Sequence, residues 1–362
     1  MLKKFHIVIA LVILFITNSV KAQNNIEIAD KKALDADELI NRGHLGEAIS
    51  LLKEAEILNP SNTDYPYKIA YAYYMIEEYD SALKILNKIA YLESSHDGVF
   101  QLLGNCYKMM GRDSDAVDIY KKGLEFFPNS GLLYLELGNH KMKLGLVNEA
   151  LGYYEKGVET DPAFASNYYW ASKIYCSSTE KVWGILYGEI FINLEQNSTR
   201  KDEISKLIFD TYKSQITFSE NSNVSINFTQ NSELLSEDLE DTSTHAISFS
   251  QFVFEPLTRF SLLNETSVSL SSLNRIRTQY LNLYFKASYN QKYPNILYNY
   301  QKNLVDSGYF EAYNYWLFMN GNEKEFLDWQ TENAVIWNNF QNWFNANSLI
   351  VDSNNHFYRR QY

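Results

Sequence analysis

Three prolines of this 362-residue chain stand at a fixed spacing, and this spacing constrains the fold more than any other feature. Pro128 and Pro162 are 34 residues apart, and Pro60 precedes Pro128 by 68 residues, twice that distance. A period of roughly 20 to 50 residues indicates repeated supersecondary units that stack on one another. With copies beginning near residues 29, 63, 97, 131 and 165, the same residue types return at the same positions.

Two positions of each copy hold small residues, as two closely crossing helices require. The eighth position reads Ala36, Ala70, Gly104, Gly138 and Ser172. The twentieth position reads Ala48, Ala82, Ala116, Ala150 and Gly184. The fifteenth position holds glycine in three copies, at Gly43, Gly111 and Gly145. We expect the backbone to leave the right-handed helix there, which glycine tolerates best.

The repeats resemble a known family. Leu103-Gly104-Asn105 and Leu137-Gly138-Asn139 have the Leu-Gly-Asn core of tetratricopeptide repeats, whose spacing is also 34 residues. Residues 29 to about 196 resemble an array of about five such repeats, each a helix-turn-helix pair. The resemblance implies a superhelix whose concave face, built mostly from the first helix of each pair, binds another protein. The fifth copy departs from the pattern, and we interpret it as a degenerate repeat.

In this family, certain positions of the first helix usually face the concave side, and they supply the candidate partner-binding residues. These are Tyr67, Tyr71, Tyr74, Gln101, Asn105, Lys108, Asn139, Met142, Lys143, Tyr169 and Lys173. Tyrosine offers rigid contact area, and asparagine can donate and accept hydrogen bonds to a peptide. The lysines can pair with a carboxylate, as in family members that clamp a C-terminal carboxylate. Ala33 and Tyr67 stand where such a clamp would have lysine, and asparagine at its position is common in the family regardless of ligand.

The second half of the chain is predicted to be a mainly helical, aromatic-rich domain. We expect helices near 200–213, 270–288, 293–306, 310–319 and 322–344, a possible β-hairpin within 216–228, a mobile acidic loop near 229–245 and a flexible end at 351–362. The predicted fold class is therefore all-α. Four of the six tryptophans lie between residues 316 and 343. We interpret them as a core, and the alternative is an aromatic surface that stacks on sugars or on a partner helix.

The first 22 residues have the pattern of a signal peptide. Two lysines precede an unbroken apolar run over 7–16, and Val20-Lys21-Ala22 fits a cleavage site. The run is shorter than the ~20 residues that span a bilayer. We expect export to the bacterial periplasm, the cell surface or the medium, without stable membrane insertion after cleavage; an uncleaved anchor is the alternative. The mature chain then divides into a repeat domain, 23–198, and a C-terminal domain, 199–362.

Composition and missing motifs narrow the function. A net charge of −12 disfavours nucleic-acid binding, which needs cations to neutralise phosphates. The two cysteines, Cys106 and Cys176, are interpreted as buried apolar residues, and the six histidines have no metal-ligand spacing. No phosphate-binding glycine loop or nucleophile motif is present. We therefore expect no catalysis, cofactor or metal, and a scaffold or adaptor that binds a protein or peptide segment; the alternative is a glycan-binding protein at the cell surface.

Overall fold

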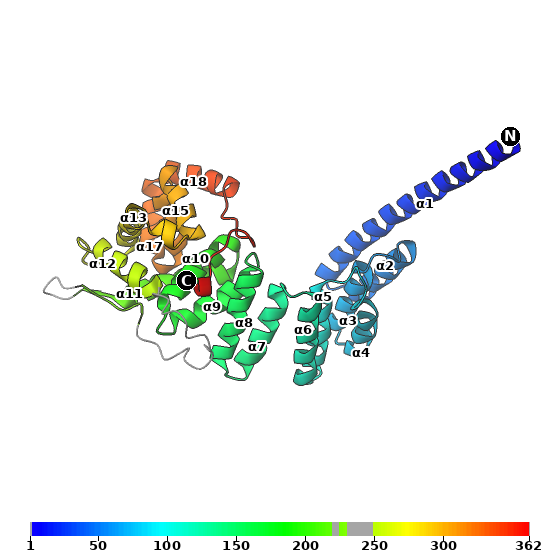
Figure 1. Ribbon diagram of the computed structural model, residues 1–362, viewed down its shortest axis with the longest axis horizontal. Helices are drawn as coiled ribbons and strands as arrows, with labels where there is room; N and C mark the ends of the chain where they lie inside the picture. Colours follow the sequence, from blue (N-terminus) through cyan, green and yellow to red (C-terminus); the bar gives the residue numbers. More distant parts are fainter. Residues whose placement is uncertain (1, 219–223, 230–248, 362) are drawn as a thin grey trace. The chain divides into compact units, whose positions relative to one another are not determined.

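The computed structural model describes residues 2–218, 224–229 and 249–361, which divide into two compact units (Figure 1). Unit 1 comprises Met1–Pro128 and unit 2 comprises Asn129–Tyr362. Almost all of the predicted acidic loop, 229–245, lies outside the described residues. The border predicted near residue 198 separates repeat from non-repeat sequence, and it stays a prediction.

Five successive helix pairs confirm the predicted repeats. Unit 1 contains α1 (Leu2–Asn41), α2 (Leu45–Leu58), α3 (Asp64–Met75), α4 (Tyr79–Ile89), α5 (Asp97–Met109) and α6 (Asp113–Phe126). Unit 2 continues with α7 (Gly131–Lys143), α8 (Val147–Thr160), α9 (Ala165–Cys176) and α10 (Lys181–Leu194). Within the described residues, none of the helices has the length and apolar character needed to cross a membrane.

The described residues that follow the repeats in unit 2 form helices and a small hairpin. These elements are α11 (Thr199–Gln215), β1 (Ile216–Phe218), β2 (Val224–Ile226), η1 (Ser250–Phe254), α12 (Glu255–Ser261), α13 (Leu270–Lys286), α14 (Tyr289–Lys292), α15 (Ile296–Asp306), α16 (Phe310–Phe318), η2 (Met319–Gly321), α17 (Glu323–Glu332), α18 (Ala334–Ala346) and η3 (Arg359–Gln361). The strands pair antiparallel, with Ile216 opposite Ile226, as the alternating pattern predicted. The described part of the chain thus has an all-α fold with one two-stranded sheet.

The small residues of the repeat have the predicted steric role. A Cβ on Gly104 would lie 2.1 Å from the ring of Tyr120, and one on Gly138 would lie 2.4 Å from the ring of Tyr154. The turn glycines also behave as predicted: the φ angles of Gly43, Gly111 and Gly145 are 80°, 75° and 74°. The second repeat has Glu77 at the same position, with a φ of 64°. The turn geometry is therefore kept even where the glycine is not.

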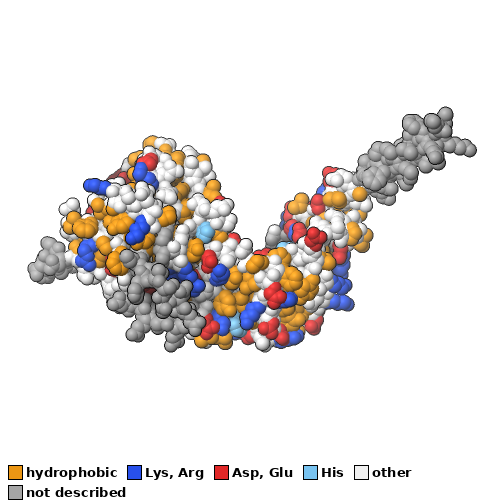
Figure 2. Space-filling view, in the orientation of Figure 1, with side chains coloured by type: hydrophobic (Ala, Val, Ile, Leu, Met, Phe, Trp, Pro, Cys, Tyr) orange, Lys and Arg blue, Asp and Glu red, His pale blue; other side chains and the backbone are white. Residues whose placement is uncertain are grey.

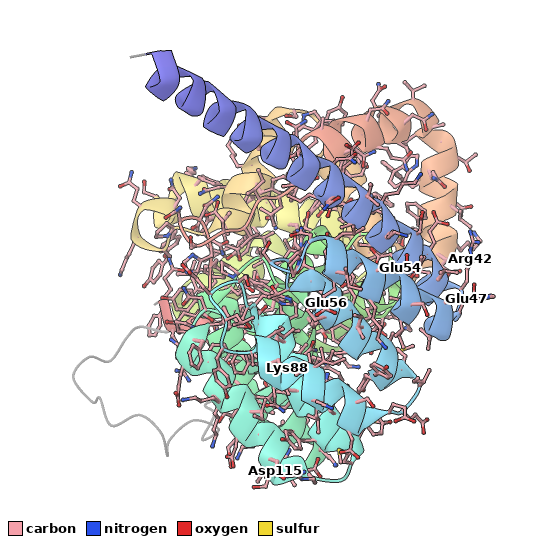
Figure 3. The ribbon with its side chains drawn as sticks, turned by 90° about the vertical axis from the view of Figure 1, so that its right-hand side faces the viewer. Arg42, Glu47, Glu54, Glu56, Lys88 and Asp115 are labelled. Carbon is pink, nitrogen blue, oxygen red and sulfur yellow. The ribbon has the colours of Figure 1, made fainter. Side chains whose placement is uncertain are left out.

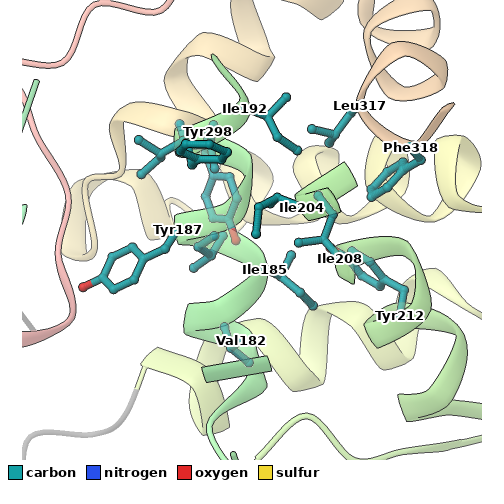
Figure 4. Packing of buried hydrophobic residues seen from close by; sticks show 14 of the residues in the cluster. Val182, Ile185, Tyr187, Ile192, Ile204, Ile208, Tyr212, Tyr298, Leu317 and Phe318 are labelled. Carbon is teal, nitrogen blue, oxygen red and sulfur yellow. The ribbon is translucent and has the colours of Figure 1, made fainter. Parts of the chain in front are cut away.

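The fifth repeat departs from the pattern because α11 packs against it. At the position where the other repeats have leucine or tyrosine, Gly188 would place a Cβ 2.7 Å from Ile208 of α11. Gly184 allows an even closer approach, since its Cβ would lie 2.5 Å from the backbone nitrogen of Cys176. Figure 4 shows Ile204 and Ile208 of α11 among the buried residues of this region. Gly188 therefore makes room for α11, and Gly184 lets α10 lie close to α9 within the fifth repeat.

Most C-terminal aromatic residues form the core of unit 2, as predicted. Phe340, Phe344 and Phe326 are buried, and Trp329 and Trp337 keep only 8% of their surface exposed. The predicted single helix at 322–344 is wrong, because Asn333 ends α17 and the chain restarts as α18. This break brings Trp337 against Phe326, with ring centroids 5.3 Å apart. Burying rings from both helices against each other requires the interruption.

The prediction of a flexible C-terminal end is also wrong. Phe357 is fully buried, and its ring stacks on Trp183 at a centroid distance of 5.4 Å. Arg359 donates through Nε to Glu155 of α8 at 2.8 Å, and its backbone N–H donates to the Tyr187 hydroxyl at 2.9 Å. Two or three anchoring side chains are enough to order a polar segment, and composition does not show them. The end of the chain is therefore part of unit 2.

A buried ion pair joins the repeats to the C-terminal helices within unit 2. Glu189 of α10 accepts from both terminal nitrogens of Arg277, on α13, at 2.8 and 2.6 Å. Gln301 and Tyr313 each donate to the same carboxylate at 2.8 Å. Burial by itself would lower the pKa of Arg277, but the negative charge of Glu189 raises it above its usual value. These partners satisfy the buried carboxylate, so removing Arg277 would leave a buried charge without its counter-ion.

Candidate functional site

The candidate groove residues divide between the two units. Unit 1 contains Tyr67, Tyr71, Tyr74, Gln101, Asn105 and Lys108. Unit 2 contains Asn139, Met142, Lys143, Tyr169 and Lys173. We therefore describe the two sets separately.

Two of the candidates have a structural role. The side-chain oxygen of Asn105 accepts from the Tyr120 hydroxyl at 2.7 Å, and that of Asn139 accepts from the Tyr154 hydroxyl at 3.0 Å. Each bond joins the two helices of one repeat, and both tyrosines are buried. The repeated asparagine thus satisfies a buried hydroxyl, which accounts for its presence without a ligand.

Unit 1 presents a mixed surface at its candidate positions. Tyr71 is 37% exposed and Lys108 is exposed, whereas Tyr67, Tyr74 and Gln101 are half-buried. Tyr67 packs edge-on against His96, with ring centroids 4.7 Å apart. The exposed apolar residues at the ends of α3 and α5 are Met75, Ile76, Met109 and Met110. Methionine side chains are flexible, so these exposed residues can contact apolar partners of different shapes.

Unit 2 contains a more defined site, an apolar pocket of about 440 Å³ that we call the α8–α9 pocket. Its lining comes from the end of α7, the start of α8, α9 and the turn before α10. The lining residues are Met142, Val147, Asn148, Leu151, Trp170, Lys173, Ile174, Tyr175, Ser177, Ser178 and Glu180. Pockets of roughly 300 to 1,000 Å³ commonly hold ligands. The α8–α9 pocket is therefore a candidate binding site of unit 2.

Local packing explains why the pocket is open and apolar. The α7–α8 turn at Gly145 is followed by Leu146 and Val147, which are 41% and 40% exposed. Trp170 forms a wall of the pocket, and its ring stacks on that of Tyr154 at 6.2 Å with a tilt of 15°. A tyrosine that is itself fixed by Asn139 therefore holds the largest ring of the lining. In the space-filling view, apolar side chains lie among charged ones on the surface (Figure 2).

The lysine of the pocket is already paired. Lys173 lies 2.6 Å from Glu203 of α11, and the Tyr169 hydroxyl donates to the other oxygen of that carboxylate at 2.5 Å. Burial alone would raise the pKa of Glu203, but the hydrogen bonds from Lys173 and Tyr169 lower it. Burial likewise opposes the charge of Lys173, and Glu203 and Tyr169 raise its pKa above the usual value. Tyr169 itself is 7% exposed, so it supports the network instead of offering a surface.

Sequence reasoning found two of the pocket residues, Met142 and Lys173, and missed the others. Val147, Asn148 and Leu151 lie on a second helix of a repeat, whereas the candidates came only from first helices. The apolar residues Leu144, Leu146 and Val147 around the turn glycine are the sequence feature that could have indicated this surface. Such a turn is usually polar, because it faces water.

The thiols of the chain are poorly suited to nucleophilic chemistry. Burial raises the pKa of Cys106 to about 12 and that of Cys176 to about 11, so both are protonated at neutral pH. Both are buried, as the sequence analysis predicted. Within the part of the chain that the structure describes, no cluster of three or more histidine, cysteine or acidic side chains could hold a metal ion.

Comparison with known proteins agrees with the repeat assignment. Residues 99–130 match the family model of the tetratricopeptide repeat. BBSome complex member BBS4 of Bos taurus is 29% identical over 117 residues, which cover 30% of this chain and 22% of that protein, so the match spans about a fifth of the relative.

Two solved structures show limited similarity to this chain. The structure of Pseudomonas aeruginosa pilF is 17% identical, with a TM-score of 0.42, and covers 53% of this chain and 86% of its own. TTC0263, a tetratricopeptide protein of Thermus thermophilus, is 14% identical, with a TM-score of 0.40, and covers 50% and 98%.

Proposed function

We propose that this tetratricopeptide-repeat protein is a non-catalytic interaction module that binds a segment of another protein. The α8–α9 pocket carries the proposal, because it is an apolar hollow of about 440 Å³ beside the exposed Leu146 and Val147. A partner inserts one or two apolar side chains there, and removing their surface from water contributes about 25 cal/mol per Å². Buried anchors of this kind usually dominate the affinity of an interface.

A charged substitution at the rim of the pocket tests this function. Val147→Glu places a carboxylate against the apolar lining at a position that is 40% exposed, so the helix pair should still fold. Val335→Glu is the matched control, because it adds the same charge at a 74% exposed residue of α18 in the same unit. A displayed library of random peptides is selected on the wild-type protein and measured on both variants.

The expected result is a set of peptides with apolar anchors whose binding to the Val147→Glu variant weakens at least about tenfold, or 1.4 kcal/mol. Binding to the Val335→Glu variant should equal that of the wild type. Peptides that bind both variants equally well would place the interaction elsewhere and reject the pocket as the binding site.

We also propose that the protein is exported and acts in the cell envelope. The support is the N-terminal pattern of two lysines, an apolar run over 7–16 and the Val20-Lys21-Ala22 sequence. Mass spectrometry of the protein from the source cells tests this directly. A mature N-terminus at Gln23 in an envelope or medium fraction is the expected result, and an intact N-terminus in the cytosolic fraction would contradict it.

A further inference from the structure

The basic side chain of the α8–α9 pocket forms an ion pair at the edge of the pocket. Lys173 is the basic side chain of the lining, and it is the residue that would capture a carboxylate. Glu203 approaches it to 2.6 Å from α11, outside the lining of the pocket. A carboxylate of the protein thus occupies the place where a carboxylate of a partner would bind.

The pair is fixed by its neighbours. The Tyr169 hydroxyl donates to Glu203 at 2.5 Å and accepts from Lys173 at 3.2 Å, so three side chains form one closed set of contacts. Lys173 also lies over the rings of Tyr169 and Trp170, at 5.0 and 5.2 Å from their centroids. Because each partner holds the other two, a competing carboxylate must break hydrogen bonds that are already made.

The other charges near the pocket do not replace the neutralised lysine. Arg200 lies over the ring of Tyr169 at 5.1 Å and is itself paired with Glu195 through two of its nitrogens. Glu180 is the carboxylate of the lining, and beside it Lys181 donates through Nζ to the backbone carbonyl of Ser178, so this part of the rim has one charge of each sign. A negatively charged ligand therefore has to compete with Glu203 for Lys173, whereas an uncharged apolar ligand does not.

We propose that Glu203 determines the specificity of the α8–α9 pocket: by pairing with Lys173, it makes the pocket select uncharged apolar side chains of a partner and reject carboxylate-bearing segments. This inference rests on the proposed function, since it requires the pocket to be a binding site. It specifies which class of ligand the pocket binds and which residue determines that preference. Selectivity of this kind comes from an unfavourable interaction with the wrong ligand as much as from contacts with the right one.

Two dyes that differ by one anionic group serve as probes. N-phenyl-1-naphthylamine is uncharged and apolar, and 1-anilinonaphthalene-8-sulfonate has the same rings with a sulfonate added. Their dissociation constants are measured by fluorescence titration of the full chain, and the ratio of the two constants reports the charge selectivity. Val147→Glu and Val335→Glu show whether binding of the neutral dye occurs in the pocket.

Glu203→Gln is the decisive variant, and Glu332→Gln, an exposed position of α17 outside the pocket lining, is its matched control. We expect Glu203→Gln to tighten binding of the sulfonate dye about tenfold and to leave the neutral dye within about twofold. Adding Lys173→Met to Glu203→Gln should abolish the gain, because the freed cation is its source. The gain should also shrink in 0.5 M salt, where charges are screened beyond about 4 Å.

The possible outcomes distinguish the role of Glu203 from the existence of the binding pocket. If the neutral dye binds in the pocket but Glu203→Gln leaves the ratio unchanged, the specificity role of Glu203 is overturned and the pocket stands. If the gain persists in the double variant, Lys173 is not the cation and the inference is likewise overturned. If Val147→Glu and Val335→Glu bind the neutral dye equally, the pocket itself is rejected, and the proposed site falls together with the inference.

Discussion

Unit 1 and unit 2 contain the same helix-pair repeat but use charged residues differently. In unit 1 the ion pairs lie at the surface: Lys32 and Glu54, 2.7 Å apart, keep 28% and 57% of their side chains exposed. Figure 3 labels Glu54 and other charged residues of unit 1. In unit 2 the side chains of Arg277 and Glu189 keep only 7% and 1%. Surface pairs contribute little to stability, whereas breaking a buried pair is costly.

The difference shows what the non-repeat elements add. Repeat contacts are local, since each helix pair packs on its neighbours. The carboxylate of Glu189 instead receives hydrogen bonds from residues 88, 112 and 124 positions later in the chain. Such long-range polar contacts make the unit depend on many distant residues at once. Unit 2 should therefore unfold more cooperatively and respond more strongly to single substitutions.

The sequence provides a separate readout for the two units. All six tryptophans lie in unit 2, at positions 170, 183, 316, 329, 337 and 343. Tryptophan fluorescence during urea unfolding therefore follows unit 2, while hydrogen exchange of amides in residues 29–128 follows unit 1. The two transitions need separate analysis, because a two-unit chain is not a two-state system.

The largest effect is expected from Arg277→Met. This substitution leaves Glu189 buried and unpaired, which should destabilise unit 2 by about 3–5 kcal/mol. The fluorescence transition should move to lower urea, and hydrogen exchange in unit 1 should not change. Lys206→Met, which breaks a surface pair of α11 with 60% and 50% exposed side chains, is the control. Equal shifts in the two variants would contradict the contrast between buried and surface charges.

A somewhat smaller effect is expected at the end of the chain. Phe357→Ala removes a fully buried ring between Trp183 and Phe249, whose centroids lie 5.4 and 6.0 Å away, and should cost unit 2 about 3 kcal/mol. Phe260→Ala, at a 59% exposed residue of α12, is the matched control. The urea midpoint followed by fluorescence measures both. If Phe357→Ala were as mild as the control, the end of the chain would not belong to the core of unit 2.

The same steric substitution, made once in each unit, should destabilise the two units by similar amounts. Gly104→Ala and Gly138→Ala each force a Cβ into a tyrosine ring, and overpacking of this kind costs about 1–3 kcal/mol. Similar losses in unit 1 and unit 2 would mean that the repeat itself is equivalent in both. Gly152→Ala has no atom within 4 Å of its Cβ, and it should stabilise α8 by about 0.5–1 kcal/mol. A stabilising effect of Gly138→Ala would contradict the packing.

The inter-helix hydrogen bonds of the repeat should give about 1 kcal/mol each. Asn105→Ala and Asn139→Ala remove the side-chain oxygens that accept from the Tyr120 and Tyr154 hydroxyls, so each should destabilise its own unit. Adding Tyr154→Phe to Asn139→Ala should recover part of the loss, because the orphaned hydroxyl is removed. Urea unfolding measures the unit 2 variants and hydrogen exchange the unit 1 variant. No loss in either unit would leave a partner contact as the role of the asparagines.

The smallest effect concerns the pH dependence of unit 2. The pKa of Glu203 is lowered from 4.5, so its ion pair contributes stability above that value and loses it as the pH falls through the lower folded-state pKa. Wild type and Glu203→Gln should differ slightly in urea midpoint at pH 7 and converge toward pH 3. The effect is small because 45% of the Glu203 side chain is exposed. A difference that grows as the pH falls would contradict the sign.

Much of the fold could be predicted from the sequence because the repeat imposes the same local demands five times. Small residues at the eighth and twentieth positions, such as Ala36 and Ala48, are required wherever two helices cross closely, and glycine is favoured at the turn position, where φ is positive. These constraints act within one helix pair, so the sequence by itself determined the number, type and approximate bounds of the repeat helices.

The tertiary structure decided what depends on distant residues. The packing of α11 explains Gly188, and the approach of Glu203 neutralises Lys173. Contacts with distant residues such as Glu155 and Trp183 order the polar end of the chain. The α8–α9 pocket likewise combines residues of two repeats, of which the position rule found Met142 and Lys173. A residue pattern records the local period of a helix, whereas burial and charge pairing at a site depend on which segments meet in space.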